Sequence, residues 1–397
     1  MRFGRTPIFR ATSEKGSLQG PLRAGLCALV CALGVALGFL WANGWNPTAF
    51  FRIGDRYPHP GSLPGDAIVH RGEVGYDGQF FLALAYDPAL RDPRTAAALD
   101  NTRYRARRIL FPALAHVLAL GNAALIPWAM IAINVLAIAC LAAVVAHELA
   151  PGSPWLLAVP LAFPGVWVAL LLSTADVLGV LFLLVALSLS RQNRALGAGI
   201  ALLLAALTRE IYIFPALLLA ANSVLAGRRG AAATIFALQV PAFLWIGLVW
   251  VYSPAGNTGL GENFGVPFEG IAQSALNLLR SPWSARNAYE AACFVMLLLA
   301  AAGLAVQCAR RWRSARIVAL FAIPFLASLV CARVAIMGYH AGYSRAFLGI
   351  FFLLWFLPDS PRFSAFRAAL TAASAVISLL FIGARIIASA GGELRLL

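Results

Sequence analysis

The chain has 397 residues, of which 61% are apolar and only 12% are charged, and its formal net charge is +15 at pH 7. A soluble globular domain carries about 25% charged residues, and the apolar runs recur along the whole length, which excludes a soluble domain with one anchor. The composition predicts an all-α polytopic membrane protein, because spanning helices satisfy their own backbone hydrogen bonds. The alternating pattern of a transmembrane barrel is missing from the sequence.

The positive charge does not indicate a nucleic-acid partner. Lys15 is the only lysine among 31 basic residues, and the arginines lie mostly in short turns between apolar runs, where they set membrane topology. The abundance of arginine, alanine, leucine and glycine is typical of a GC-rich bacterial genome. We therefore expect a multi-pass protein of the bacterial inner membrane.

The N-terminal region predicts a polar tail and a retained anchor. Residues 1–21 are polar and basic, and the run 24–42 has 19 residues without a charge. This run is long for the apolar part of a signal sequence, and no small-x-small cleavage site follows it. We expect 1–21 to be a cytoplasmic tail and 22–397 to be a single membrane domain.

A charged stretch, 43–108, follows the first span and is predicted to be an extracytoplasmic loop. Its centre is Gly75-Tyr76-Asp77-Gly78-Gln79-Phe80-Phe81, and its end is Arg103-Tyr104-Arg105-Ala106-Arg107-Arg108. The next segment, 109–120, is too short to cross a hydrocarbon core of about 30 Å, so we expect a juxtamembrane helix there.

Apolar runs recur behind this loop and, with the first span, predict about eleven membrane crossings. The later runs are 123–146, 154–172, 174–190, 195–208, 211–226, 231–252, 291–309, 317–335, 346–357 and 367–387. Several are short or contain proline, which is typical of spans that line a cavity or meet a thinned bilayer.

The short turns predict the orientation of the bundle. Arginines gather at 191–194, 227–230, 310–316 and 358–366, whereas the alternate turns at 173–176 and 209–210 contain only Arg209. Cytoplasmic turns carry such an excess of positive charge, so we place the N-terminus inside. The loops 43–108, 253–290 and 336–345 are then outside.

Asp77 is the first candidate for chemistry. Phe80, Phe81, Leu84 and Ala85 follow it with the spacing of one helical face, so we expect an interfacial helix with Asp77 at its water-facing N-terminus. An aspartate in this place caps a helix, and it also suits a general base. The residues alone leave both roles open.

Arginine clusters are the second candidates. The run 103–108 suits anchoring to anionic head groups, and it also suits bidentate contacts to a phosphate; we expect a mixture of the two. The pair Arg209-Glu210 favours function, because charge near the membrane is costly. Arg345, in the polar island 339–345, either snorkels to the surface or binds phosphate.

Two further expectations concern single positions. Arg209 and Arg345 stand at the outer ends of short spans, so we predict that they converge at the mouth of one groove. Asp176 is expected chiefly to cap the helix that begins at 177.

Cysteine and histidine give no sign of a metal or disulfide framework. The six cysteines lie in or beside apolar runs, and the five histidines lack the spacing of metal ligands. We expect the cysteines to be small core residues without disulfides. The sequence has no phosphate-binding loop and no dinucleotide motif, so we expect no nucleotide cofactor.

The order of these features resembles the GT-C superfamily of integral-membrane glycosyltransferases, including the mannosyltransferase branch of glycolipid anchor synthesis. The similarity rests on one span, a long outer loop with Tyr76-Asp77-Gly78-Gln79-Phe80-Phe81, the segment RYRARRILFPALA at 103–115 and the hairpin sequence ALTRE at 206–210. It covers the architecture of roughly residues 22–226.

The resemblance implies an activity and a set of roles. A sugar passes, with inversion, from a polyprenyl phosphate to an extracytoplasmic glycolipid, polysaccharide or protein, and Asp77 is the general base. Arginines stabilise the departing lipid phosphate, a role that Arg209 and Arg345 match. The expected substrate-binding residues are Tyr76, Gln79, Arg105, Arg107, Arg108, Arg209, Glu210, His340, Tyr343 and Arg345.

No metal ligand is expected, because the metal-using relatives have a second acidic residue beside the base, whereas Asp87 lies ten residues beyond Asp77. A transporter or flippase of a lipid-linked or anionic solute is the alternative. A transporter would more often place charges near the bilayer midplane, whereas the candidate charges here lie at the outer rim. A scaffold for envelope assembly also stays open.

Overall fold

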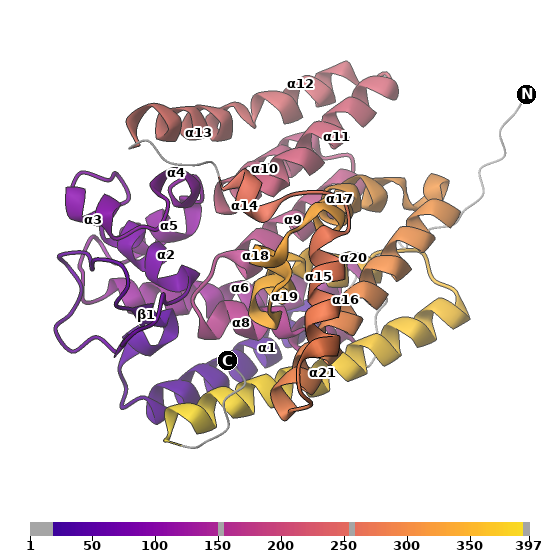
Figure 1. Ribbon diagram of the computed structural model, residues 1–397. Helices are drawn as coiled ribbons and strands as arrows, with labels where there is room; N and C mark the ends of the chain where they lie inside the picture. Colours follow the sequence, from indigo (N-terminus) through magenta and orange to yellow (C-terminus); the bar gives the residue numbers. More distant parts are fainter. Residues whose placement is uncertain (1–18, 150–154, 254–258, 392–397) are drawn as a thin grey trace, which may run out of the picture.

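The computed structural model describes residues 19–149, 155–253 and 259–391, so most of the expected cytoplasmic tail lies outside the described residues. Within these ranges the chain is almost entirely helical, which confirms the predicted class (Figure 1). The exception is a parallel pair of two-residue strands, β1 (Ile53–Gly54) and β2 (Val69–His70).

Six helical segments of the described chain are long and apolar enough to cross a membrane, and each matches a predicted span. They are α1 (Gln19–Ala42), α6 (Ile126–Glu148), the pair α12 (Arg229–Ala237) and α13 (Val240–Tyr252), α16 (Ala285–Arg310), α17 (Trp312–Cys331) and α21 (Pro361–Ser389). The chain is therefore a multi-pass membrane protein built as a helical bundle.

The other five predicted spans correspond to shorter helices of 8 to 16 residues. They are α7 (Trp155–Ala162) with α8 (Pro164–Leu171), α9 (Asp176–Arg191), α10 (Ala195–Thr208), α11 (Ile213–Leu225) behind the 3₁₀ turn η2 (Glu210–Tyr212), and α20 (Leu348–Trp355). Eight residues of helix cover only about 12 Å. The total of eleven crossings therefore stays a prediction.

The predicted span 154–172 is interrupted rather than continuous. Phe163 adopts an extended backbone between α7 and α8, because the residue before a proline avoids the helical region and Pro164 follows. The resulting break leaves α8 as a short, buried helix.

Small residues bring the first two long helices together. Ala24, Ala28, Ala32 and Ala36 repeat every four residues on the buried face of α1, which packs along α6. A side chain at Gly25 would begin 3.2 Å from the carbonyl oxygen of Ala139 on α6. Small side chains allow the close approach on which helix association in lipid depends.

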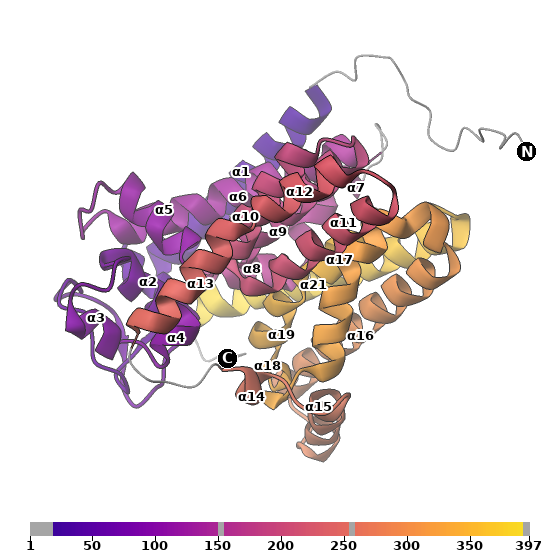
Figure 2. The same cartoon turned by 90° about the horizontal axis from the view of Figure 1, so that it is seen from above.

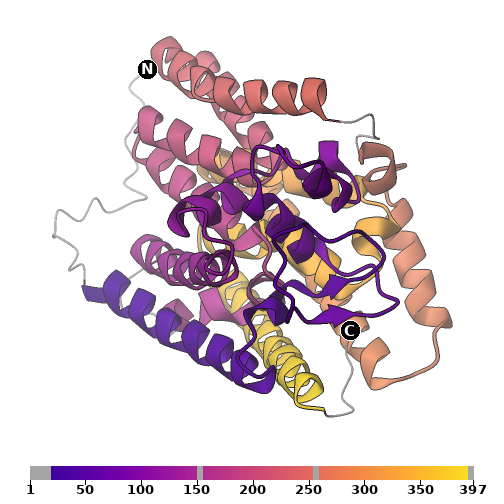
Figure 3. The same cartoon turned by 90° about the vertical axis from the view of Figure 1, so that its left-hand side faces the viewer.

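The first loop folds into short helices that cover one end of the bundle, which faces the viewer in Figure 3. They are the 3₁₀ turn η1 (Pro47–Phe51), α2 (Asp77–Tyr86), α3 (Pro93–Ala97), α4 (Thr102–Arg105) and α5 (Leu110–Leu118). The helix predicted behind Asp77 and the short helix predicted at 109–120 are both present.

Four more short helices lie between α13 and α20: α14 (Leu260–Asn263), α15 (Glu269–Arg280), α18 (Val334–Met337) and α19 (His340–Ala346). Helix α19 packs against α8, where a side chain at Gly165 would begin 2.3 Å from the carbonyl oxygen of Ser344. The missing side chain at Gly165 therefore allows Arg345 to reach the centre of the site.

The antiparallel arrangement of α9 and α10 places the arginines of the 191–194 turn at the opposite end of the helix pair from Asp176 and Arg209. Helices α9 and α10 are neighbours joined by a tight turn, and they run in opposite directions (Figure 2). Asp176 and Arg209 consequently meet at one end, whereas Arg191 and Arg194 lie at the other. This separation is the one that the turn composition predicted.

The cysteines differ from expectation in their location. All six are free, but only Cys293 and Cys308 are buried as core residues. Cys27, Cys31 and Cys140 lie exposed on the outer faces of α1 and α6, because an apolar surface of a membrane helix needs no protein cover.

Candidate functional site

Asp77 lies at the centre of a buried network of charges. Its Oδ1 is 2.8 Å from an Arg105 guanidinium nitrogen, and its Oδ2 accepts a hydrogen bond from Arg345. The side chain is only 15% exposed. Asp77 is the first residue of α2, but Tyr76 occupies the N-cap position without a side-chain capping bond. The expected water-facing capping aspartate is therefore wrong: Asp77 is inward and ion-paired.

Asp176 completes this network and corrects a second expectation. It makes no capping bond at the start of α9. Its Oδ1 instead lies 2.8 Å from Arg209, its Oδ2 lies 3.0 Å from Arg345, and Thr174 donates a hydrogen bond of 2.8 Å. Arg209 and Arg345 thus converge on one carboxylate, although only Arg209 lines the apolar groove described below, and Arg345 bridges Asp176 to Asp77. The two ion pairs that Asp176 makes with arginines replace the capping hydrogen bond expected at the start of α9.

Tyr76 holds Arg345 in place. Its hydroxyl accepts a hydrogen bond of 2.7 Å from Arg345 Nε and donates one of 2.9 Å to the carbonyl oxygen of Ala341. Gln79 lies on the far side of the α2 terminus, where its amide binds the backbone at Gly54 and Val74. Gln79 therefore fastens the loop and lines none of the cavities described below.

The basic run 103–108 forms a second cluster. Arg105 bridges Asp77 to Asp100, with 2.7 Å to the latter. Arg108 and Arg107 lie 3.2 and 3.5 Å from the carboxylate of Glu210, at the end of the hairpin between α10 and α11. The run and the hairpin, about a hundred residues apart in sequence, therefore share one set of ion pairs.

The second cluster closes one end of an apolar groove of about 580 Å³. Its polar end is lined by Tyr104, Arg108, Arg209 and Glu210. Its walls come mainly from α11 and α17 and from the end of α19; among them are Phe214, Leu218, Ile323, Pro324, Ala327, Ala346 and Phe347. We call this cavity the apolar groove. Its walls suit a long hydrocarbon chain, and its polar end carries arginines and one carboxylate.

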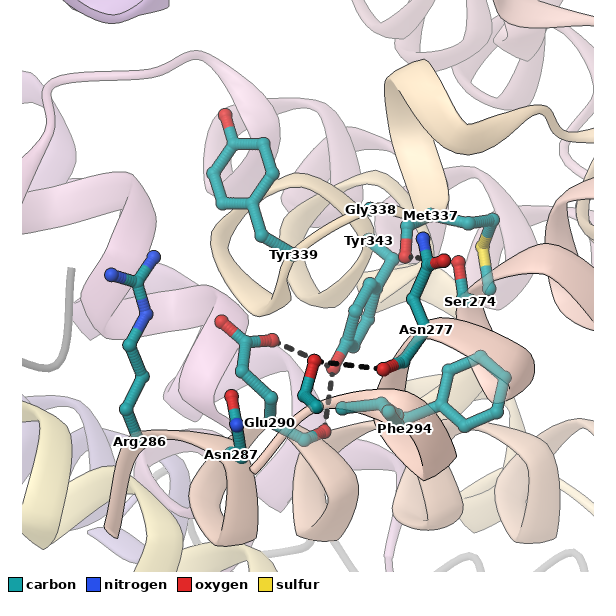
Figure 4. A pocket seen from close by; sticks show the side chains of 12 residues that line it. Ser274, Asn277, Arg286, Asn287, Glu290, Phe294, Met337, Gly338, Tyr339 and Tyr343 are labelled. Carbon is teal, nitrogen blue, oxygen red and sulfur yellow. Dashed lines mark hydrogen bonds between the residues drawn. The ribbon is translucent and has the colours of Figure 1, made fainter. Parts of the chain in front are cut away.

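A polar cavity of two lobes lies beside the N-terminal part of α16, and Figure 4 shows its first lobe. One lobe, of about 300 Å³, is bounded by α15, α16 and α19, and the other, of about 270 Å³, is bounded by the loop around Arg52, Glu73 and Tyr76. Arg286, Glu290 and Tyr339 line both lobes. We call the two lobes together the polar cavity.

His340 stands behind this cavity, whereas Tyr343 lines its first lobe. His340 is fully buried, and both its backbone N–H and its Nδ1 lie 2.7 Å from the Glu290 carboxylate. The Tyr343 hydroxyl donates to the Glu290 carbonyl oxygen at 3.0 Å. The two residues therefore orient Glu290, a carboxylate that the sequence analysis overlooked at the edge of the predicted span 291–309.

The charges around Asp77 decide its protonation. Burial alone would raise the pKa of Asp77, but the positive charges of Arg105 and Arg345 and the hydrogen bond from Arg345 outweigh it and hold this pKa well below its usual range. The carboxylate is therefore ionised, and in this arrangement it is a weak base.

The described residues contain no group of three or more His, Cys, Asp or Glu side chains placed to hold a metal ion. Comparisons with protein-family models, curated proteins and solved structures find no match for this chain. The argument for function therefore rests on the site itself.

Proposed function

We propose that the chain is an integral-membrane glycosyltransferase that moves a sugar from a polyprenyl phosphate to an extracytoplasmic glycolipid, polysaccharide or protein. The observation that carries the proposal is an ion-paired carboxylate, Asp77, whose neighbour Tyr76 lines the polar cavity. Its partner Arg345 shares the carboxylate of Asp176 with Arg209, which lines the apolar groove. In this proposal the site faces the outside of a bacterial inner membrane.

The apolar groove suits a polyprenyl chain. Its walls are almost entirely hydrocarbon, and the described ion pairs gather at one end, where Arg108 and Arg209 line it. A lipid phosphate presents the complementary pattern of a long apolar chain and an anionic head. Planar guanidinium groups bind phosphate oxygens with two parallel hydrogen bonds, which favours arginine at such a position.

The arginines of the site can pair with two kinds of anion, namely the carboxylates of the chain and the phosphate of a bound donor. Without donor they neutralise Asp77, Asp176 and Glu210. A phosphate that enters the network competes for the same guanidinium groups. When Arg345 turns part of its hydrogen bonding to the phosphate, the pKa of Asp77 rises from its depressed level, because a nearby opposite charge is the main cause of that depression. Donor binding thereby makes Asp77 a better base.

The proposed step balances as a single displacement. An acceptor hydroxyl oxygen forms a bond to the anomeric carbon, and the bond from that carbon to the phosphate oxygen breaks, leaving its electron pair on the phosphate. Asp77 accepts the hydroxyl proton, and the attack from the opposite face inverts the anomeric centre. Arginines already in place stabilise the negative charge that develops on the leaving phosphate. The step requires no metal ligand or nucleotide cofactor.

Native mass spectrometry of the purified full-length protein tests the donor assignment. We expect a co-purified polyprenyl phosphate, and addition of undecaprenyl phosphate should fill any unoccupied protein. Ala327→Trp places an indole in the groove and should weaken lipid binding by about tenfold, because overpacking costs about 1–3 kcal/mol and about 1.4 kcal/mol is a factor of ten in affinity. Ala302→Trp is the matched control, since Ala302 is exposed on α16 outside the groove. Absence of lipid in every preparation, or equal occupancy in the two variants, contradicts the proposal.

A further inference from the structure

The polar cavity differs in chemistry from the apolar groove. Hydroxyl and amide side chains line its first lobe, among them Ser274, Asn277, Asn287 and Tyr339. The apolar groove instead presents hydrocarbon along nearly all of its length. The lining of the polar cavity suits a ligand with many hydroxyl groups, because each such group can donate or accept hydrogen bonds.

Glu290 gives this cavity a fixed hydrogen-bond acceptor. Its residue is only 8% exposed, yet the carboxylate borders both lobes. The backbone and ring of His340 hold the two oxygens from behind, each at 2.7 Å. A carboxylate has about four lone-pair positions, so Glu290 keeps capacity for a ligand hydroxyl while its orientation is already set.

Arg286 supplies a positive charge where the two lobes meet. Arg286 and Glu290 are one turn apart on α16, and their charged ends lie on the side of this helix that faces Tyr339 (Figure 4). In contrast to Arg52, which lies 3.0 Å from Glu73 in the second lobe, Arg286 makes no ion pair within the described chain. Arg286 is exposed, so an anionic ligand group reaches its guanidinium without displacing an ion pair.

The polar cavity and the apolar groove are separated by the residues of the proposed reaction. Tyr76 borders the polar cavity, and its hydroxyl binds Arg345, whose next two residues, Ala346 and Phe347, line the groove. Tyr76, Arg345 and Asp77 thus form one connected set of contacts that extends from the wall of the polar cavity toward the apolar groove.

We infer that the polar cavity binds the acceptor, and that this acceptor is an anionic oligosaccharide whose hydroxyl groups contact Glu290 and whose negative charge pairs with Arg286. Only the role of this ligand as the acceptor rests on the proposed function. The binding of an anionic oligosaccharide to the cavity is independent of it.

Binding of two soluble probes to the full-length protein in nanodiscs tests the inference. The probes are tetragalacturonate, which is anionic, and maltotetraose, which is neutral and of similar length. We expect tetragalacturonate to bind more tightly. Arg286→Gln should weaken its binding by about tenfold or more, as expected for loss of a hydrogen-bonded charge, and should change maltotetraose binding little.

Arg280→Gln is the matched control. Arg280 ends the neighbouring helix α15 and is exposed, but it lines neither lobe, so its variant removes the same charge outside the cavity. We expect Arg280→Gln to bind tetragalacturonate like the unchanged protein. Equal weakening in both variants, equal affinity for the two probes, or binding of neither probe overturns the inference.

The same preparations separate this inference from the proposed function. If undecaprenyl phosphate binds the groove but tetragalacturonate does not bind, the donor assignment stands and the acceptor inference fails. If tetragalacturonate binds with the Arg286 dependence but no polyprenyl phosphate binds, the cavity assignment stands and the donor assignment fails.

Discussion

Asp77 carries a negative charge that Arg105 and Arg345 neutralise before any substrate arrives. An aspartate in water has a pKa of about 3.9, and these arginines lower the pKa of Asp77 further. A depressed pKa keeps the carboxylate ionised as the pH falls, so its ion pairs persist at least down to the ordinary pKa and break only as the pH passes through the depressed one.

This protonation behaviour predicts different pH profiles for the free and donor-bound protein. The free-enzyme quantity kcat/KM should show no acidic limb from Asp77 between about pH 7 and about pH 5, because Asp77 stays ionised there. In the donor-bound protein Arg345 shares its charge with phosphate, the pKa of Asp77 rises, and the acidic limb of kcat should move to higher pH. An acidic limb in kcat/KM that disappears in kcat would contradict this order.

The position of a single residue was predictable from sequence when its side-chain chemistry and its position at the end of a span indicated the same role. Arg209 and Arg345 were expected to converge, because both are arginines at ends of short spans, and both bind Asp176. Asp176 itself was assigned to a cap, since the sequence beside it gives no sign of an arginine arriving from 169 residues away. Glu290 was overlooked for the same reason: its partner His340 comes from a distant helix.

At the scale of elements, close backbone contacts position the site. A side chain at Gly78 would begin 2.3 Å from the carbonyl oxygen of Leu172 and 3.2 Å from the backbone of Phe51. Helix α2 therefore lies directly on the chain that enters α9. This contact fixes Asp77 relative to Asp176, because the two aspartates begin the two helices.

We predict that Gly78→Ala destabilises the protein. The new methyl group meets backbone, which cannot move aside as a flexible side chain can, so we expect a loss of about 1–3 kcal/mol, the usual cost of overpacking. Gly247→Ala on α13 is the control, since nothing lies within 4 Å of a side chain there. Thermal unfolding in one detergent should show a lower Tm for Gly78→Ala and little loss for Gly247→Ala; equal values would argue against the close contact.

Helix identity followed from apolar length, whereas helix continuity did not. The six long helical segments and the helix behind Asp77 were predicted, because hydrocarbon runs and spacing are local signals. The break at Phe163 has a local signal in Pro164, whereas the short α20 depends on neighbouring helices that bury it. Local sequence does not report that cover, so the predicted boundaries were too regular.

At the scale of the whole molecule, the arginine-rich turns and the site occupy opposite ends of the bundle. The positive-inside rule then predicts that the site end is extracytoplasmic. Apart from the rule, the proposed chemistry also requires this direction, because the proposed acceptor is an extracytoplasmic glycolipid, polysaccharide or protein.

Cysteine labelling in intact cells tests the direction. In a background without native cysteines, Ser62→Cys should react with a membrane-impermeant maleimide, and Arg313→Cys should react only after permeabilisation. Both positions are exposed, so burial cannot explain a difference between them. The reverse pattern would place the site in the cytoplasm and remove the proposed acceptor.

The central claim, that Asp77 is the base in sugar transfer from a lipid phosphate, is tested most directly by complementation in the native host. In a deletion strain, mass spectrometry should detect accumulated sugar-charged polyprenyl phosphate and an envelope glycan that lacks one sugar, and the wild-type gene should reverse both. Asp77→Asn keeps the size of the side chain but loses the basic oxygen, so transfer should fall by about 10²-fold or more. We expect the Asn variant to insert, to bind undecaprenyl phosphate and yet to resemble the deletion. An Asn variant that restores the glycan to its wild-type level would contradict the account.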